Sequence, residues 1–466
     1  MILRQKRKPA RQQGRKLANI CALVRQTMKY FSTNRKSSHA TFREAVLKGQ
    51  PDDKGLYFPE KIPTLSEDFW KEFQTKSKEQ IAFEVIKPYI GDEITDETLF
   101  QICEETVNFD FPLVRITEQI STLELFHGAT LAFKDVGARF MSRCLQYFSR
   151  EKPVKTIVIV ATSGDTGGAV ANGFHETENV EVVILYPKGK VSNVQEVQLT
   201  TLGKNISALE VNGNFDDCQT LAKTALADEN LKQKVFLTSA NSINIARWLP
   251  QQFYYFYAFQ EWVKKFKTQN SKLKTPVICV PSGNFGNLAA GILAHISSLP
   301  CEKFIAATNA NDVIPKLLES GKMEIENSVA TLSNAMDVAN PSNFVRILEI
   351  FDNDYLDLKK KLEAVSVSDE QTIKTMREVY EKHAYILDPH GAVGFYALEK
   401  YLEKTPNNKG FFLETAHPIK FDSVEKILGT TGEMPDAVKK LFAEEKFKTA
   451  IEASYEDLKE ILLEKI

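Results

Sequence analysis

The sequence lacks several features that define familiar classes of protein. Its apolar runs, such as 156–161 and 181–186, are strand-sized and fall far short of the roughly eighteen residues that a membrane-spanning helix needs. Its six cysteines form no Cys-x-x-Cys pair and have no histidine at ligand spacing, so neither a disulfide framework nor a zinc site is indicated. We therefore expect a metal-free protein without a membrane span, in the reducing environment of the cytoplasm.

Acidic residues are missing from the start of the chain. Residues 1–27 carry eight basic residues and no acidic one, so the remainder holds 51 basic and 61 acidic groups, a net charge of −10. A surface that follows nucleic-acid phosphates needs a net basic face. The charge of the main body therefore argues against a nucleic-acid partner.

The basic leader at 1–27 has three interpretations: a transit peptide, a basic tail, or upstream sequence included by a start codon assigned too early. We favour the third, because Met28-Lys-Tyr-Phe-Ser-Thr reads as a natural beginning. Under each interpretation we expect the leader to lie outside the folded body.

Short β-branched runs alternate with helical periods from about residue 156 onward. The pattern predicts strands at 156–161, 181–186, 206–211, 235–238, 277–280 and 304–308. It predicts helices from 167 and from 192, and at 216–227, about 243–266, 288–295, 343–351 and 369–383. Strands separated by helices of this length form βαβ units with a parallel sheet.

These elements predict an α/β fold of two doubly wound lobes with a cleft between them. The segment 28–108 differs: it is polar and mixed, with a turn at 51–55 and one helical run near 79–89. We expect it to form an N-terminal cap region, and 109–466 to form the core of two α/β lobes.

Two glycine-rich junctions between a strand and a helix stand out, Ala161-Thr-Ser-Gly-Asp-Thr-Gly-Gly168 and Pro281-Ser-Gly-Asn-Phe-Gly-Asn287. Glycines at such a junction let amide N–H groups converge at a helix N-terminus, which favours a bound anion. Neither junction fits the dinucleotide fingerprint or the Lys-Ser/Thr ending of a P-loop, which argues against NAD and ATP. Tight packing of strand and helix explains one such turn equally well.

A lysine occupies a third element, Phe126-His-Gly-Ala-Thr-Leu-Ala-Phe-Lys134-Asp135. Lys134 follows a small apolar run at an expected helix start. Such surroundings lower the pKa of an amine, and a free amine can form a Schiff base with an aldehyde. Taken alone, a surface lysine at a helix start explains the pattern as well.

In combination these elements resemble the threonine synthases, a family of pyridoxal-phosphate enzymes of fold type II. The blocks that carry the resemblance occur in the family order and cover nearly all of the chain after residue 27: Met28-Lys-Tyr-Phe-Ser-Thr, Lys54-Gly-Leu-Tyr-Phe-Pro, Phe126 to Asp135, Thr162-Ser-Gly-Asp-Thr-Gly, Gly283-Asn-Phe-Gly-Asn287 and Glu414-Thr-Ala-His-Pro-Ile-Lys-Phe421. The resemblance is to the longer-chain branch, and it implies a fold like that of the tryptophan synthase β subunit, with the cofactor in the cleft.

The resemblance implies particular roles for residues of this chain. Lys134 forms the Schiff base with pyridoxal 5′-phosphate, and Thr415 faces the pyridine nitrogen. Asp165 lies beside the ring hydroxyl, with its charge state open. The remaining cofactor residues hold the phosphate: Gly283, Asn284, Phe285, Gly286 and Asn287.

A second anion site is implied for the phosphate of O-phospho-L-homoserine, formed by Ser163, Thr166, Asn241 and Arg247. Asn244 and Arg247 lie three residues apart at a helix start, hence on one face, and an arginine can grip a phosphate through two hydrogen bonds. A capped helix with an exposed arginine is the alternative. His390 lies in another shared block, but the family often has Thr where this chain has Gly391, so His390 is left out of the predicted site.

The implied reaction converts O-phospho-L-homoserine and water into L-threonine and phosphate, in a monomer or homodimer. Two alternatives stay open: a phospho-lyase that eliminates phosphate without adding water, and a phosphate-ligand binding module that has lost catalysis. The presence of Lys134 argues against the second.

Overall fold

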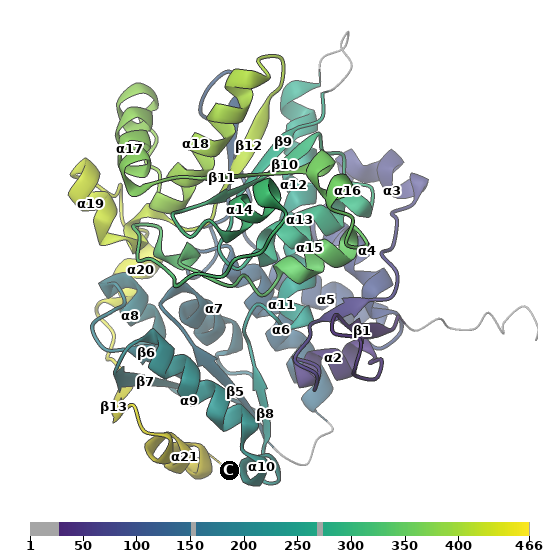
Figure 1. Cartoon of the computed structure of the whole chain (residues 1–466). Helices are drawn as coiled ribbons and strands as arrows, with labels where there is room; N and C mark the ends of the chain where they lie inside the picture. Colours follow the sequence, from purple (N-terminus) through teal and green to yellow (C-terminus); the bar gives the residue numbers. More distant parts are fainter. Residues whose placement is uncertain (1–27, 151–154, 268–273, 466) are drawn as a thin grey trace, which may run out of the picture.

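The computed structural model describes residues 28–150, 155–267 and 274–465, so the predicted leader at 1–27 lies outside the described residues. The chain is built around two large sheets with helices on their faces, and an N-terminal region packs beside them (Figure 1). The chain therefore has the predicted α/β architecture of two lobes with an added N-terminal region.

The first lobe contains a six-stranded sheet in the order β11-β10-β9-β12-β4-β3. All neighbours are parallel except β3 and β4, which are antiparallel. The strands are β3 (Leu113–Arg115), β4 (Ile120–Glu124), β9 (Val277–Pro281), β10 (Lys303–Thr308), β11 (Leu362–Ser366) and β12 (Gly410–Glu414). The helices of this lobe are α12 (Phe253–Phe266), α13 (Gly286–Ile296), α14 (Val313–Ser320), α15 (Phe344–Ile350), α16 (Tyr355–Lys361), α17 (Asp369–His383), α18 (Pro389–Lys404) and α19 (Asp422–Leu428), with the short η3 (Asn334–Met336) and η4 (Pro418–Lys420).

The second lobe contains a five-stranded parallel sheet in the order β13-β7-β6-β5-β8. Its strands are β5 (Thr156–Ala161), β6 (Val180–Pro187), β7 (Ile206–Asn212), β8 (Phe236–Ser239) and β13 (Lys448–Glu452). The helices are α7 (Asp165–Phe174), α8 (Asn193–Thr200), α9 (Phe215–Ala227), α10 (Glu229–Lys232), α20 (Asp436–Leu441) and α21 (Tyr455–Glu464). The C-terminal end of the chain thus returns to this lobe and supplies an edge strand that the sequence pattern did not predict.

The N-terminal region combines a two-stranded antiparallel ribbon with four helices: β1 (Tyr30–Ser32), β2 (Tyr57–Pro59), α2 (Phe42–Lys48), α3 (Glu67–Glu72), η1 (Phe73–Thr75), α4 (Lys78–Ile90) and α5 (Asp96–Thr106). Capping boxes at Thr41 and Ser77 start α2 and α4. Helices α2 and α5 contact α6 (Lys134–Ser149), and α4 contacts α12. The region therefore packs on both the helix that begins at Lys134 and the first lobe.

Most predicted strands and helices are present within a residue or two, including β5 at 156–161 and α17 at 369–383. The predicted long helix at about 243–266 is wrong: it is divided into α11 (Ile245–Trp248), η2 (Leu249–Gln252) and α12. Pro250 accounts for the break, because a proline has no amide hydrogen and its ring clashes with the preceding turn of an α-helix.

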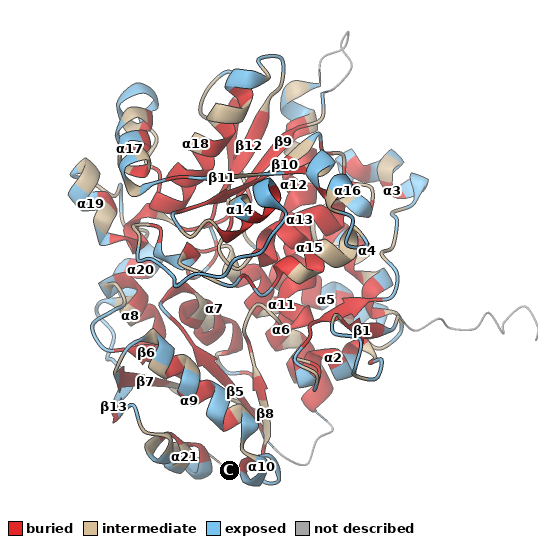
Figure 2. Cartoon of the chain, viewed as in Figure 1, coloured by how far each residue is buried: buried red, intermediate tan, exposed pale blue. Residues whose placement is uncertain are grey.

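The strand ends determine where a site can form. Because β4, β9 and β12 are parallel, the segments that follow them leave the sheet at the same edge, and the same holds for β5 and β8. The inner strands of both sheets, such as β5, β6, β9 and β12, are buried, whereas the edge strand β13 and the outer faces of helices such as α9 and α17 are exposed (Figure 2). Among the described residues, no helix is both long and apolar enough to cross a membrane.

Candidate active site

A cavity of about 1270 Å³ lies at the carboxyl ends of the strands. Eleven of the twelve predicted site residues line it: Lys134, Ser163, Thr166, Asn241, Arg247, Gly283, Asn284, Phe285, Gly286, Asn287 and Thr415. The twelfth, Asp165, is buried behind the wall. Segments that are up to about 280 residues apart in the sequence thus meet in one cavity, as the parallel sheets require.

Lys134 is the first residue of α6, and its side chain is 18% exposed. Burial lowers the pKa of the Lys134 amine; the Asp165 carboxylate opposes this shift, while the charges of Lys420 and Arg247 add to it. The position at a helix N-terminus also disfavours a positive charge. The surroundings therefore shift the Lys134 amine toward its neutral, nucleophilic form.

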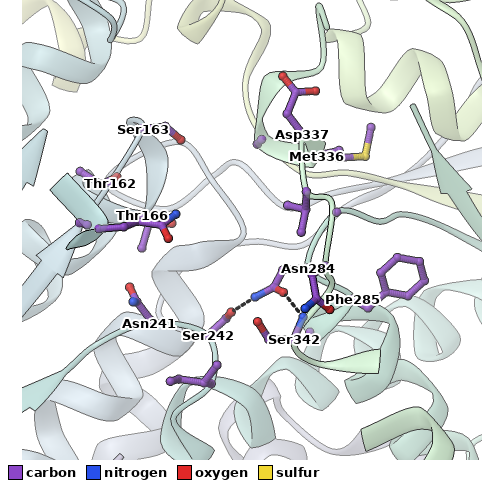
Figure 3. Close-up of a pocket in the computed structure, with 18 of the residues that line it drawn as sticks. Thr162, Ser163, Thr166, Asn241, Ser242, Asn284, Phe285, Met336, Asp337 and Ser342 are labelled. Atoms are coloured by element: carbon purple, nitrogen blue, oxygen red, sulfur yellow. Dashed lines mark hydrogen bonds between the residues drawn. The ribbon is translucent and has the colours of Figure 1, made fainter. Parts of the chain in front are cut away.

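The Gly283–Asn287 turn joins β9 to α13 and is held from several sides. Phe285 adopts a left-handed conformation with φ of 60°, which a bulky residue rarely accepts, and its ring packs edge-on against Phe344. The Asn284 side chain donates to the Ser242 hydroxyl at 2.8 Å and accepts from the Ser342 amide at 2.6 Å (Figure 3). The turn is therefore a rigid cradle at a helix N-terminus, the arrangement that binds phosphate.

One feature of this turn fits the phosphate of pyridoxal phosphate, and another holds the turn close to a neighbouring segment. The Asn287 Oδ1 accepts hydrogen bonds from Tyr254 and Tyr255, which fixes the amide so that its buried Nδ2 donor has no protein partner. At Gly283 a β-carbon would lie 2.6 Å from the Met336 Cα, so only glycine permits this approach of the two segments. A phosphate oxygen would supply the acceptor that Asn287 lacks.

The opposite wall is the β5–α7 junction. The Thr162 hydroxyl accepts hydrogen bonds from the Gly164 and Gly167 amides, so these two donors are already satisfied. Ser163 is exposed in the cavity and Thr166 is partly exposed, whereas Thr162 is buried. Figure 3 shows Ser163 and Thr166 across the cavity from Asn284 and Phe285. The hydroxyl groups, rather than the whole amide nest expected from the sequence, are the polar groups offered by this junction.

Arg247 and Asn241 complete that side of the cavity. Arg247 is only 4% exposed, donates to the Ala240 carbonyl, and has a buried Nε without a protein partner. Burial lowers the pKa of this guanidinium to about 10, with the Asp135 charge opposing the shift, so it stays positive at neutral pH. The alternative of an exposed arginine is wrong. Asn244 does not line the cavity with it: its side chain caps α11 and donates to the Val46 carbonyl.

Gly137 explains how Arg247 reaches the site. A β-carbon at Gly137 in α6 would lie 2.7 Å from the Arg247 carbonyl oxygen and 3.1 Å from its Nε. The missing side chain lets α11 approach α6 one turn after Lys134. The predicted amine and the predicted phosphate-binding arginine are thus brought together by a glycine that the motifs did not single out.

The surroundings of Asp165, the residue whose charge was open, favour its ionised form. Burial alone would raise the pKa of its carboxyl, but the charges of Lys420 and Lys134 and the hydrogen bonds from Lys420 and Gln195 hold that pKa well below its usual range. Its Oδ2 lies 3.9 Å from the Lys134 Nζ, and its Oδ1 lies 2.9 Å from the Lys420 Nζ. Lys420 belongs to the motif Glu414–Phe421, and the sequence alone predicted no role for it.

His390 and Glu414 also lie at the site without having been predicted there. His390 lines the cavity, and its Nε2 accepts from the Ala335 amide while its Nδ1 contacts Asp388. Glu414 is fully buried; burial and the Asp388 charge raise the pKa of its carboxyl. A β-carbon at Gly391 would overlap the Glu414 Oε2 at 1.7 Å, so Glu414 accounts for the glycine that departs from the family pattern.

Comparisons with known proteins identify the family of the chain. Three family models match in succession: "Threonine synthase N terminus" at residues 29–107, "Pyridoxal-phosphate dependent enzyme" at 120–411 and "Threonine synthase, C-terminal" at 391–462. The threonine synthase of Escherichia coli (strain K12) is 44% identical over 414 residues, covering 88% of this chain and 93% of that protein. The threonine synthase of Buchnera aphidicola from Acyrthosiphon pisum is 42% identical, covering 94% and 100%.

Solved structures show the same relationship. The crystal structure of threonine synthase from E. coli aligns with a TM-score of 0.84 and 40% identity, covering 94% of this chain and 100% of that chain. The structure of PLP-bound threonine synthase from Brucella melitensis aligns with a TM-score of 0.86 and 32% identity, covering 93% and 98%. The fold, the cavity and these alignments agree that the chain belongs to the threonine synthase family of pyridoxal-phosphate-dependent, fold-type-II enzymes.

Proposed function

We propose that this enzyme converts O-phospho-L-homoserine and water into L-threonine and phosphate, with Lys134 as the reacting amine. The observation that carries the proposal is one cavity that the Lys134 side chain lines, with a set of hydrogen-bond donors on each of two facing walls. A substrate that bears its own phosphate needs a second anion site beside the one for the cofactor phosphate. Arg247, buried and without a carboxylate within ion-pair distance among the described residues, supplies the charge for it.

The residues of the Gly283–Asn287 turn would hold the cofactor phosphate, and Thr415 would offer its hydroxyl to the pyridine nitrogen. When bound, pyridoxal phosphate supplies a carbonyl that condenses with amines and a conjugated ring that stores electron pairs during proton loss from substrate carbons. A hydroxyl holds a ring proton less firmly than a carboxylate does. Proton handling at the substrate Cα is therefore left to the Lys134 amine, whose pKa is lowered by burial.

The groups on the opposite wall would bind and orient the substrate. Ser163, Thr166 and Asn241 offer hydrogen-bond donors, and Arg247 adds a positive charge beside them. These interactions fix the substrate phosphate, and the same donors stabilise the charge on that phosphate as it leaves.

The test is a product assay. Purified protein with pyridoxal phosphate should form L-threonine and inorganic phosphate in equal amounts from O-phospho-L-homoserine, and Lys134→Ala should form neither. Lys190→Ala is the matched control, since Lys190 is an exposed lysine that lines the same cavity. Formation of 2-oxobutyrate in place of threonine would identify the phospho-lyase, and binding without turnover would identify the binding module.

Three further assignments belong to this proposal. The chain functions in the cytoplasm as a monomer or homodimer, and it divides into the N-terminal region 28–108 and the catalytic core 109–466. The five described cysteines are buried thiols without disulfides, which supports a reducing compartment. Sedimentation of the purified protein checks the oligomeric state, and a fluorescent fusion of the full chain checks the location.

A further inference from the structure

Lys420 is a fully buried lysine beside the active site. It ends η4, the short helix that follows β12 and Thr415, and its side chain has no exposure to solvent. Its Nζ forms an ion pair with the Asp165 Oδ1 at 2.9 Å and donates to the Thr130 carbonyl at 2.6 Å. Burying a lysine charge is costly unless the charge is paired, and Asp165 supplies that pair.

The Asp165 carboxylate is shared unequally between two lysines. Its Oδ1 accepts from Lys420 and from the Gln195 side chain at 3.0 Å. Its Oδ2 lies 3.9 Å from the Lys134 Nζ, beyond hydrogen-bond distance. One carboxylate neutralises one ammonium group, and the closer, hydrogen-bonded partner is Lys420.

The other charged groups near Lys134 do not replace that counter-ion. From α11, Arg247 is positive and faces the same cavity. From α6 itself, the Asp135 carboxylate is taken up by the Thr130 amide at 2.8 Å and by the Thr130 hydroxyl. From the segment after β12, the pKa of His417 is lowered by burial to about 4, so it is neutral above that pH.

We propose that Lys420 is a positioning residue that occupies Asp165 as its counter-ion and thereby favours the neutral, reactive form of the Lys134 amine. The Lys420 charge offsets part of the attraction that the Asp165 carboxylate would otherwise exert on a protonated Lys134. Lys420 also has a structural role. Its hydrogen bond to the Thr130 carbonyl and its ion pair with Asp165 together connect the segment before Lys134 to the start of α7. This inference rests on the proposed role of Lys134 but on no particular substrate.

The proposal predicts how the reactivity of Lys134 changes with charge at position 420. In the full chain prepared without cofactor, Lys134 is acetylated with a trace of acetic anhydride at pH values from 6 to 11, and the Lys134 peptide is quantified by mass spectrometry. In Lys420→Met the freed Asp165 carboxylate should pair with Lys134. An opposite charge at this distance raises an amine pKa by about 1–3 pH units, so labelling at pH 8 should fall at least tenfold.

Two further variants separate charge from folding. Asp165→Asn should have the opposite effect, with Lys134 labelled faster at pH 7 than in the wild type. The double variant Lys420→Met with Asp165→Asn removes the pair together and should restore the wild-type labelling midpoint, which a damaged fold would not do. Lys420→Arg keeps the charge and should stay close to the wild type. Acetylation of the exposed Lys190 in the same digest is the internal control.

The outcomes distinguish this inference from the proposed function. An unchanged midpoint in Lys420→Met, or a double variant that does not recover, would overturn the role of Lys420 while leaving Lys134 as the reacting lysine. Added pyridoxal phosphate should protect Lys134 from acetylation in the wild type. Failure of that protection would instead overturn the proposed role of Lys134 itself.

Discussion

Replacing Arg247 with methionine should separate recognition of the substrate phosphate from recognition of the rest of the substrate. Methionine keeps an unbranched apolar stem but removes the guanidinium. In the wild type the Nε of that guanidinium has no protein partner, and one of its terminal nitrogens donates to the Ala240 carbonyl. A hydrogen bond to a charged group contributes about 1.5–3 kcal/mol. That loss corresponds to an affinity for O-phospho-L-homoserine that is about 10- to 150-fold weaker.

The assay compares two ligands on each variant. Binding of O-phospho-L-homoserine and of L-homoserine, which lacks the phosphate, is followed through the absorbance of the bound cofactor, and kcat/KM is measured with the phosphorylated substrate. The ratio of the two affinities should fall by the stated factor in Arg247→Met, and kcat/KM should fall at least as far if the arginine also steadies the leaving phosphate. Arg139→Met is the matched control, because Arg139 lies on α6, outside the cavity, and hydrogen-bonds to Asn108. Equal weakening of both ligands would refute the reasoning and assign Arg247 a structural role.

Three shorter predictions concern the buried groups around the site. Glu414→Gln should raise the melting temperature at pH 8 and leave it unchanged near pH 4. The pKa of the buried Glu414 carboxyl is higher in the folded than in the unfolded chain, so the folded state is favoured when the pH is below the pKa of the unfolded chain. This advantage is lost as the pH rises, whereas glutamine stays neutral at every pH. His417→Gln should instead raise the melting temperature near pH 4 and leave it unchanged at pH 8. Because the folded-state pKa of His417 is about 4, the wild type loses up to about 3 kcal/mol of folding free energy as the pH falls from about 6.5 toward 4. Melting curves across that range check this prediction. Gly283→Ala should weaken cofactor retention on desalting more than Gly286→Ala does. A β-carbon at Gly283 would lie 2.6 Å from the Met336 Cα, whereas one at Gly286 would lie 3.3 Å from the Asn343 side chain. Equal retention in the two variants would show that the turn tolerates the added carbon.

The parts of the site that the sequence predicted are those whose chemistry lies in one short segment. Lys134 follows a small apolar run, and the Gly283–Asn287 turn follows a strand. The local sequence pattern therefore predicts a helix start at each of these positions. The parallel order of the strands then brings these segments together without further information. The resemblance of the motifs added the assignment of each anion site.

The parts that sequence reasoning missed depend on contacts between distant segments. Lys420 meets Asp165 across 255 positions of sequence, and Glu414 determines Gly391 through a contact between β12 and α18. A buried lysine in an apolar stretch reads like a surface lysine until the fold is known. The strands β4 and β12 were missed for a related reason, because each carries polar residues that the buried sheet interior accepts, such as Thr122 and Glu414.

Reduction with borohydride tests the central claim most directly. The purified full chain is incubated with pyridoxal phosphate, treated with borohydride, digested, and mapped by mass spectrometry for the lysine that carries the cofactor. The account predicts a single major modified peptide, the one that contains Lys134, and its loss in Lys134→Ala with the melting temperature retained. Stoichiometric label on another lysine, such as Lys420 or Lys190, would contradict the account.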